Sequence, residues 1–347
     1  MLMANFLKTN FAWPALCSRG LGLGLGLELG LGLCLGLGVV QGALAQELGK
    51  YPEQPIRLIV PFAPGGGVDT AARLVAKQMQ GKLGVTVVVE NRPGGNGTIG
   101  SKAVQSANPD AYTLLFSAAT HILAKEVMTS VPYDPISDFL PVARVGEAAL
   151  LMVISPNLKE KKLNDVIVSA KLNREKWNAA IPALGAPSHV ATLYLAKKSN
   201  LSISMVPYKG TAPALVDVAG GHSQILLDSI ISLLPMAKTG KVHPVVVTSL
   251  KRSPLAPDIP TADESGLPGF QFMSWYAIWA PKGTAPERVQ YLNTVANESV
   301  TELVKSGIFA QNGIEGVNES VAKFTQYINS ELSLSHDLLK EAGFKPE

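Results

Sequence analysis

Serine and histidine side chains occur together in two segments, YTLLFSAATH and GAPSHVA, and such residues can form a nucleophile with its general base. In the second segment Ser188 and His189 are adjacent, and neighbouring side chains on a helix diverge by about 100°, so they cannot form a catalytic pair. In the first segment Ser117, Thr120 and His121 follow an apolar run. Hydroxyls and an imidazole at a strand end can donate hydrogen bonds to a carboxylate, or they can simply cap a helix.

The other side chains that could carry catalysis form no known set. The sequence has neither the G-x-S-x-G motif of serine hydrolases nor the H-E-x-x-H motif of zinc enzymes. Asp228, which ends the run SQILLD, has no second acid nearby in sequence to share acid–base work. No metal-ligand spacing relates the histidines His121, His189, His222, His243 and His336. We therefore predict a protein that is not an enzyme and holds no metal.

A glycine triplet, Gly65 to Gly67, follows the apolar run IRLIV and precedes Asp69 and a helical pattern. Glycine lets a ligand approach the backbone closely, and amides at a helix N-terminus attract anions. No Gly-Lys-Ser/Thr follows the triplet, so this is not a nucleotide-binding P-loop. The loop is either an anion site or a tight structural turn, and in both cases we expect Asp69 to cap the helix.

A second glycine-rich segment, RPGGNGTIG, matches the G-x-G-x-x-G pattern of dinucleotide-binding folds through Gly95, Gly97 and Gly100. Pro93 and an extra glycine lengthen the turn, and no acid ends a following strand about twenty residues later, where the ribose partner belongs. We therefore predict no nucleotide cofactor, and no other cofactor.

The segment VPYKG places Tyr208 and Lys209 after a further apolar run. Lys209 could attract an anion over a distance while Tyr208 closes a ligand cleft. The alternative is a tyrosine that covers a domain edge beside a solvated lysine.

Residues 1–45 have the features of a secretory signal peptide. Lys8 and Arg19 precede a Leu-Gly run over 21–40, and Ala43-Leu44-Ala45 fits the small-x-small cleavage rule. We expect cleavage after Ala45 and a periplasmic protein; the alternative is a leader kept as a membrane anchor. Cleavage would remove both cysteines, Cys17 and Cys34.

A formal net charge of +3 over 347 residues is too small and too dispersed for a nucleic-acid-binding surface. From residue 56 onward, nine short apolar runs alternate with helical patterns such as 70–81 and 213–220. This alternation predicts an α/β protein with parallel sheets covered on both faces. Nine strands favour two sheets over one.

The apolar runs at 144–154 and 270–281 have few turn residues, so we expect the chain to cross between domains there. The C-terminal stretch 285–342 contains amphipathic helices and no evident strand, so it must cover a sheet built elsewhere. These points predict one lobe formed by 46–148 and 272–347, and a second lobe formed by 149–271.

The motifs taken together resemble one family. The segments PFAPGGGVDTAARLVA, VVVENRPGGNGTIGSKAV, VPYDPISDFLPVARV, VPYKGTAPALVDVAGG and SGLPGFQFMSWYAIWAPKGTAPERV are similar, in order, to the Bug-type receptors. These are extracytoplasmic solute-binding proteins of tripartite tricarboxylate transporters, and the resemblance covers essentially the whole chain after the leader. It implies a type II periplasmic-binding-protein fold, in which two doubly wound lobes joined by crossover strands close on a ligand by a hinge motion.

The resemblance also implies a monomeric receptor without catalysis that binds a small carboxylate and delivers it to the membrane permease subunits of the transporter. Backbone amides and bridging waters would hold the carboxylate, while side chains, Asp228 among them, would sort ligands. Pro187 departs from the small polar residue usual at its position. Carried onto this sequence, the ligand-binding residues would be Phe62, Gly66, Gly67, Asp69, Ser117, Thr120, His121, Gly185, Ser188, His189, Tyr208 and Asp228.

Two other functions stay open at this point. One is an exported hydrolase or isomerase that uses His121 or Asp228 as a base on a carboxylate substrate. The other is a sensory receptor that passes ligand binding to a signalling partner. The sequence leaves the identity of the carboxylate undetermined.

Overall fold

Every apolar run predicted as a strand forms one in the computed structural model, which describes residues 49–347. The predicted signal peptide, 1–45, lies outside the described residues. The strands are β1 (Ile56–Val60), β2 (Val87–Asn91), β3 (Thr113–Ser117), β4 (Phe139–Ile154), β5 (Asn178–Ile181), β6 (Ser204–Pro207), β7 (Ile225–Ser229), β8 (His243–Val247), β9 (Met273–Pro281) and β10 (Glu315–Gly316).

Helices separate most of these strands, as the alternation predicted. The longer ones are α2 (Gly67–Leu83), α3 (Thr98–Gln105), α6 (Leu163–Leu172), α7 (Pro187–Lys198), α8 (Thr211–Gly220), α9 (Ile230–Lys238), α10 (Pro286–Lys305) and α12 (Val321–Glu341). The short ones are the 3-10 turns η1 (Gly95–Gly97) and η2 (Arg174–Lys176) and the single turns α4 (Ala119–Ile122), α5 (Ala124–Val127) and α11 (Ile308–Gln311).

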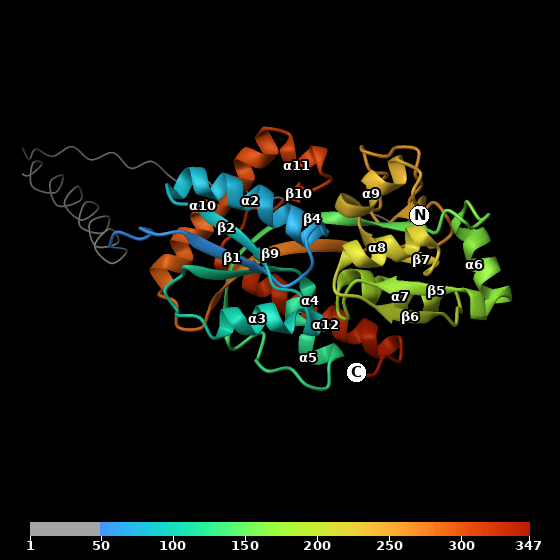
Figure 1. Cartoon of the computed structure of the whole chain (residues 1–347), viewed down its shortest axis with the longest axis horizontal. Helices are drawn as coiled ribbons and strands as arrows, with labels where there is room; N and C mark the ends of the chain where they lie inside the picture. Colours follow the sequence, from blue (N-terminus) through green and yellow to red (C-terminus); the bar gives the residue numbers. More distant parts are fainter. Residues whose placement is uncertain (1–48) are drawn as a thin grey trace, which may run out of the picture. The chain divides into compact units, whose positions relative to one another are not determined.

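The first group of strands, here called lobe 1, has the order β2-β1-β3-β9-β4. β1 pairs in parallel with β2 and β3, whereas β9 pairs antiparallel with both β3 and β4. The predicted parallel pairing is thus present in β1, β2 and β3, and the sheet becomes mixed because the returning strand β9 enters lobe 1 from the opposite direction. Helices α2 and α10 lie on one side of these strands and α3 and α12 on the other (Figure 1).

The second group, lobe 2, is built on the far end of β4. Residues Leu150–Ile154 pair antiparallel with β7, and β8 also pairs with this end of β4, while β5 pairs in parallel with β6 and β7. β4 is 16 residues long and so belongs to both lobes. β4 and β9 run side by side between the lobes (Figure 1). The lobe boundaries at 148/149 and 271/272 stay a prediction.

Each lobe has its own apolar core. In lobe 2 the cluster joins α6 and α7 to β4, β5 and β7 through residues such as Val166, Leu195 and Met152. In lobe 1 it joins α3 and α12 to the strands through Val104, Phe324 and the buried Trp279. Burial of this apolar surface is the main force that holds each lobe together.

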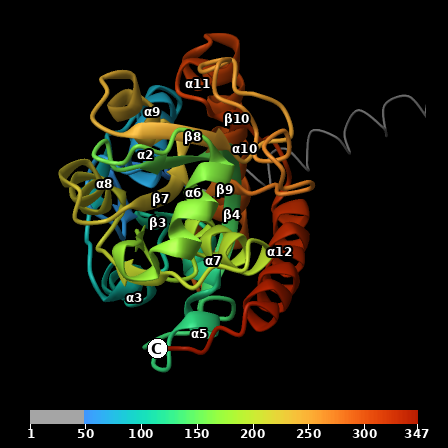
Figure 2. The same cartoon turned by 90° about the vertical axis from the view of Figure 1, so that its right-hand side faces the viewer.

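The C-terminal stretch differs from the prediction in one detail. It contains the two-residue strand β10, which pairs antiparallel with Gly146 and Glu147 of β4. So short a strand has no periodic signal, which is why the sequence pattern does not reveal it. Helix α12 then runs along the outside of the molecule beside the crossing strands (Figure 2).

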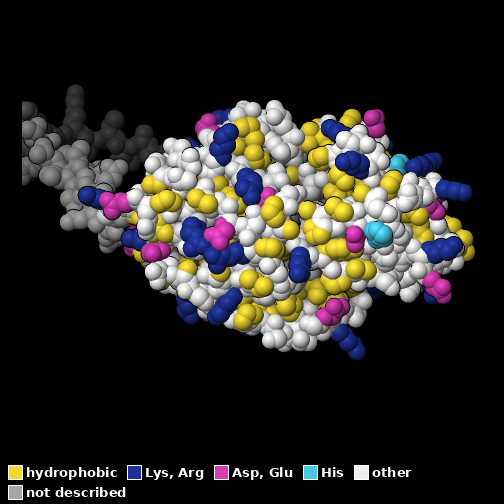
Figure 3. Space-filling view, viewed as in Figure 1, with side chains coloured by type: hydrophobic (Ala, Val, Ile, Leu, Met, Phe, Trp, Pro, Cys, Tyr) yellow, Lys and Arg dark blue, Asp and Glu magenta, His cyan; other side chains and the backbone are white. Residues whose placement is uncertain are grey.

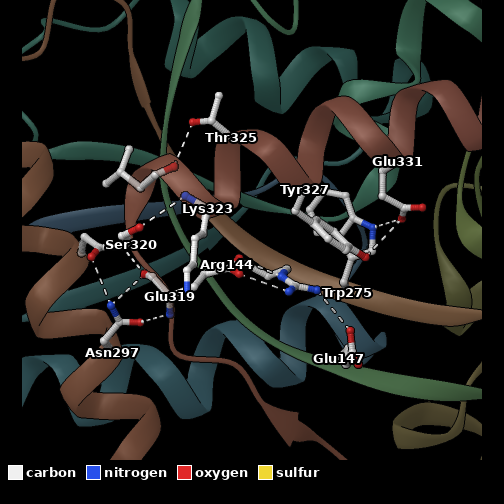
Figure 4. A network of polar contacts seen from close by, with 12 residues as sticks. Arg144, Glu147, Trp275, Asn297, Glu319, Ser320, Lys323, Thr325, Tyr327 and Glu331 are labelled. Carbon is white, nitrogen blue, oxygen red and sulfur yellow. Dashed lines mark hydrogen bonds and ion pairs between the residues drawn. The ribbon is translucent and has the colours of Figure 1, made fainter. Parts of the chain in front are cut away.

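A polar network fastens the start of α12 to β4 and β9 (Figure 4). The Arg144 guanidinium donates to Glu319 at 2.9 Å and to Glu147 at 3.3 Å, and it lies 3.6 Å from the centre of the Tyr327 ring. The Trp275 indole N–H donates to the Glu331 carboxylate at 2.5 Å. Burial raises the pKa of both Glu147 and Glu331. The network therefore places half-buried carboxyls next to one guanidinium at the crossover.

Candidate functional site

A small cavity lies between the lobes and encloses about 40 Å³. Its walls come from the segments that follow β1 and β3 in lobe 1 and β5 and β6 in lobe 2, together with one residue of β7 and one of β9. A liquid water occupies roughly 30 Å³ and ligand pockets usually exceed about 300 Å³, so a larger ligand can enter only when the lobes separate. The lining residues are Phe62, Gly66, Val68, Asp69, Ala118, Thr120, Pro182, Ala183, Ala186, Pro187, Gly210, Thr211, Asp228 and Ser274.

Three longer helices begin at this cavity. The residues that precede their first turns are Gly66 for α2, Ala186 for α7 and Gly210 for α8, and all three line the cavity. None of the three supplies a side-chain cap. The first N–H groups of a helix have no partner within the helix, and they carry its positive dipole end. The cavity therefore receives partial positive charge from both lobes, although no lysine or arginine lines it.

Asp69 stabilises the glycine loop and does not cap α2. Helix α2 begins at Gly67 with Gly66 before it, so the prediction of an Asp69 cap was wrong. The Asp69 carboxylate instead accepts hydrogen bonds from the Gly65 N–H at 3.0 Å, the Arg73 guanidinium at 3.0 Å and the Asn91 amide at 2.9 Å. Burial acts to raise its pKa, but these donors outweigh burial and lower the pKa below its ordinary value. Asp69 is thus an ionised carboxylate whose charge is already satisfied.

Asp228 provides a different kind of carboxyl on the lobe 2 side. It is buried, and the Thr211 hydroxyl donates to it at 2.5 Å. Burial raises the pKa of Asp228, and the Thr211 hydrogen bond offsets this only in part. The end of β7 thus brings a buried carboxyl with a raised pKa next to the hydroxyl of the first residue of α8.

The lobes touch each other closely around the cavity. A Cβ added to Gly67 would lie 2.9 Å from both the Ser229 Cβ and the Tyr276 hydroxyl, and that hydroxyl donates to Ser229 at 2.8 Å. Across the cleft, the Ala63 N–H donates to the Lys209 carbonyl at 3.3 Å. Gly67 therefore allows the two lobes to pack closely, and it does not line the cavity.

Two predicted residues from the β3 loop are buried away from the cavity. His121 packs among Tyr133, Phe139 and Trp279, with ring centres 4.5 to 5.8 Å away. Burial lowers its pKa to about 3, although the Pro135 carbonyl acts in the opposite direction. Ser117 is fully buried in β3, and its hydroxyl has no hydrogen-bond partner. Of this predicted group, Thr120 alone lines the cavity.

Of the segment around α7, Ala186 and Pro187 line the cavity, but the predicted residues Gly185, Ser188 and His189 do not. α7 begins at Pro187 after Ala186, so Ser188 lies within the first turn of the helix and does not cap it. The Ser188 hydroxyl is buried without a partner, and a Cβ on Gly185 would lie 3.1 Å from Leu123 in lobe 1. His189 Nδ1 accepts a hydrogen bond from the Gly185 N–H at 3.1 Å, and burial lowers the His189 pKa to about 4.

Tyr208 is held inside lobe 2. Its hydroxyl donates to Asp217 at 2.7 Å and lies 3.2 Å from the Ser223 hydroxyl. Tyr208 does not line the cavity. The structure therefore brings five predicted residues to the cavity: Phe62, Gly66, Asp69, Thr120 and Asp228.

The sequence reasoning missed several lining residues. Thr211 and Gly210 come from the segment KGTAP, next to the predicted residues Tyr208 and Lys209. A glycine directly before a helical pattern, the signal that identified the loop at Gly66, is also present at Gly210. Ser274 lies in β9, and no local pattern connects it with the other residues.

Larger hollows lie along the crossover and are lined mainly by apolar side chains. One of about 430 Å³ lies between α7 and α12, and another of about 520 Å³ is lined by Ile230, Leu255 and Ile314. Both include Glu147, and neither is lined by the first residues of α2 or α8. On the face in Figure 3, basic and acidic side chains are interspersed among hydrophobic and uncharged ones.

Within residues 49–347, no helix is both long and apolar enough to cross a bilayer. In the same part of the chain no three His, Cys, Asp or Glu side chains come close enough together to hold a metal ion.

Two α/β lobes, two crossing strands and a cavity between the lobes define a periplasmic binding protein. The chain matches the family described as "Tripartite tricarboxylate transporter family receptor" over residues 71–344, and it belongs to that family. It is therefore a solute receptor and not an enzyme. This confirms both the family and the α/β binding-protein fold that the sequence motifs predicted.

Known proteins with similar sequences or structures agree with this assignment. The chain is 35% identical to Protein BugT of Bordetella pertussis over 297 residues, which is 85% of this chain and 91% of that protein. A structure of the periplasmic binding protein BugD has 32% identity and a TM-score of 0.81, covering 86% of this chain and 100% of that one. A structure of R. palustris Rpa4515 with adipate has 30% identity and a TM-score of 0.80, with coverage of 86% and 100%.

Proposed function

We propose that this receptor binds a small carboxylate in the interlobe cavity, held by the starts of helices α2, α7 and α8. The observation that carries the proposal is the convergence of three helix starts without side-chain caps on one cavity that has no lysine or arginine in its wall. Backbone N–H groups at helix starts bind anions through hydrogen bonds and the helix dipole. Rpa4515, a similar protein, was solved with the dicarboxylate adipate.

The side chains of the cavity fit a carboxylate that also carries a hydrogen-bonding group. Asp228 is buried, burial raises the pKa of its carboxyl, and the Thr211 hydroxyl donates a hydrogen bond to it. Asp228 and Thr211 can then exchange hydrogen bonds with a second polar group of the ligand. Phe62, Ala183 and Val68 offer apolar contacts to the carbon chain between such groups.

The wider role follows from the family. The receptor would close on its ligand by bending at β4 and β9 and would deliver it, as a monomer, to the membrane permease of a tripartite transporter. We propose export by the signal peptide 1–45 with cleavage after Ala45. Lobe boundaries at 148/149 and 271/272, which divide β4 between the lobes, are part of the same proposal.

Calorimetric titration of the purified protein with mono-, di- and tricarboxylates tests the ligand class. Adipate, malate and citrate form the test group, while a sugar and a diamine of similar size are the controls. We expect at least one carboxylate to bind and to be recovered chemically unchanged. Binding of the sugar or the diamine with no response to any carboxylate would overturn the ligand class, and conversion of a bound carboxylate would overturn the receptor function.

A further inference from the structure

Asn96 joins the two lobes outside the ligand cavity. It lies in η1 of lobe 1, and its side-chain amide donates to the Leu184 carbonyl of lobe 2 at 2.9 Å. In return the Leu184 N–H donates to the Asn96 side-chain oxygen at 2.7 Å. The Asn96 side chain thus pairs with both the backbone N–H and the backbone carbonyl of Leu184, which is 88 positions away. Rotating the amide by 180° would lose both bonds, so the contacts themselves fix its orientation.

The backbone at Asn96 is shaped for this contact. Its φ of 53° and ψ of 36° place it in the left-handed region, which asparagine tolerates better than most residues. Gly95 and Gly97 on either side also have positive φ values, 54° and 89°. The loop therefore turns tightly and presents the amide of Asn96 to lobe 2.

The position of Leu184 connects this contact to the cavity. Leu184 follows Ala183, which lines the cavity, and precedes Gly185, which packs against Leu123 and Val127 of lobe 1. Asn96 and Leu184 themselves do not line the cavity. The pair can therefore influence how tightly the lobes close without touching a ligand in the cavity.

We propose that Asn96 is an interlobe latch that holds the receptor closed on its ligand and so slows ligand release. The two hydrogen bonds exist only while the lobes are together, so they favour the closed arrangement and must break before a ligand leaves. Asn96 is a positioning residue, because it acts through the Leu184 loop. The effect on ligand release rests on the proposed function; the effect on lobe opening does not.

The variant Asn96→Gly removes the amide and keeps a residue that favours the left-handed backbone. Asn200→Gly is the matched control, since Asn200 has a φ of 49° and is exposed at the end of α7. Loss of two neutral hydrogen bonds predicts adipate dissociation about 5- to 30-fold faster in Asn96→Gly, measured by stopped-flow tryptophan fluorescence. Asn200→Gly should release adipate at the wild-type rate.

Amide hydrogen exchange without added ligand gives a second measurement that does not depend on ligand identity. In Asn96→Gly we expect faster exchange at Leu184 and also at Ala63, whose N–H donates across the cleft to Lys209. Faster exchange at Leu184 alone would mean a local structural role and would overturn the latch. Adipate release at the wild-type rate from an Asn96→Gly protein that binds adipate would overturn it too. If the wild type binds no carboxylate, the proposed function fails and exchange at Ala63 alone decides the latch.

Discussion

At the scale of single residues, the two glycines of the first loop have different roles. Gly66 lines the cavity at the start of α2, whereas the next residue, Gly67, lies against Ser229 and Tyr276. The sequence shows two equivalent glycines in a triplet. Only the packing of β7 and β9 against α2 separates a ligand-facing residue from one that lets the lobes approach.

Gly67→Ala should interfere with closure of the lobes. The added methyl would lie 2.9 Å from buried atoms of Ser229 and Tyr276, so we expect a destabilisation of about 1–3 kcal/mol together with weaker adipate binding. Gly81→Ala in the same helix has open space and should stabilise the protein by roughly 0.5–1 kcal/mol. Urea unfolding and calorimetry check both variants. Wild-type stability and affinity in Gly67→Ala would contradict the packing role.

His121 shows why a strand-end rule is insufficient at this scale. The rule correctly places Thr120 and His121 after β3, with Ser117 as the last residue of the strand, but it does not say where each side chain points. The chain turns through α4, and His121 is directed into the aromatic cluster of Tyr133, Phe139 and Trp279. An imidazole can pack there because burial keeps it neutral.

At the scale of elements, β4 and β9 connect the two lobes, and α12 packs beside them. Arg144 of β4 is the charge that joins β4 to α12, since it pairs with Glu319 and Glu147 and stacks on Tyr327. Its side chain is 13% exposed. The long apolar runs predicted the crossing strands, but the hydrogen-bond partner Glu319 of Arg144 lies 175 residues away and follows no sequence pattern.

Arg144→Met should destabilise the protein by about 2–4 kcal/mol, because it leaves half-buried carboxylates without their cation. Arg144→Lys should recover only part of the loss, since lysine cannot stack and bond in the same fork geometry. Arg252→Met is the control: its pair with Glu264 is exposed on both sides and should contribute less than about 1 kcal/mol. If urea unfolding showed the same loss of free energy of unfolding in Arg144→Met and Arg252→Met, the Arg144 network would contribute no more to stability than an exposed ion pair.

At the scale of the whole molecule, buried titratable groups link stability to pH. Burial lowers the pKa of His121 to about 3 and of His189 to about 4, below the ordinary value of 6.5. Between these folded-state values and pH 6.5, the unfolded chain binds more protons than the folded protein does. The stabilisation present above pH 6.5 is therefore lost as the pH falls toward 4. Glu147 and Glu331 act in the opposite sense above pH 4.5, because burial raises their pKa.

We expect each buried histidine to lower the free energy of unfolding by up to about 1.4 kcal/mol per pH unit as the pH falls from 6 to about 4.5. His189→Gln should remove its share of this slope, whatever its effect on stability at pH 7. His222→Gln, at an exposed position, is the control. Urea unfolding at several pH values measures the slopes. An unchanged slope in His189→Gln would show that His189 is not kept neutral by the fold.

The sequence by itself determined the family and the order of the main strands and helices. These depend on local periodicity, turn residues and motifs, and IRLIV or MSWYAIWAP contains its signal within a few residues. Only the tertiary structure decided which side chains face the cavity, that Thr211 and Ser274 join Thr120 and Asp228 there, and that Asn96 meets Leu184. The physical reason is that such contacts depend on how β4 and β9 set one lobe against the other, and no stretch of neighbouring residues records that geometry.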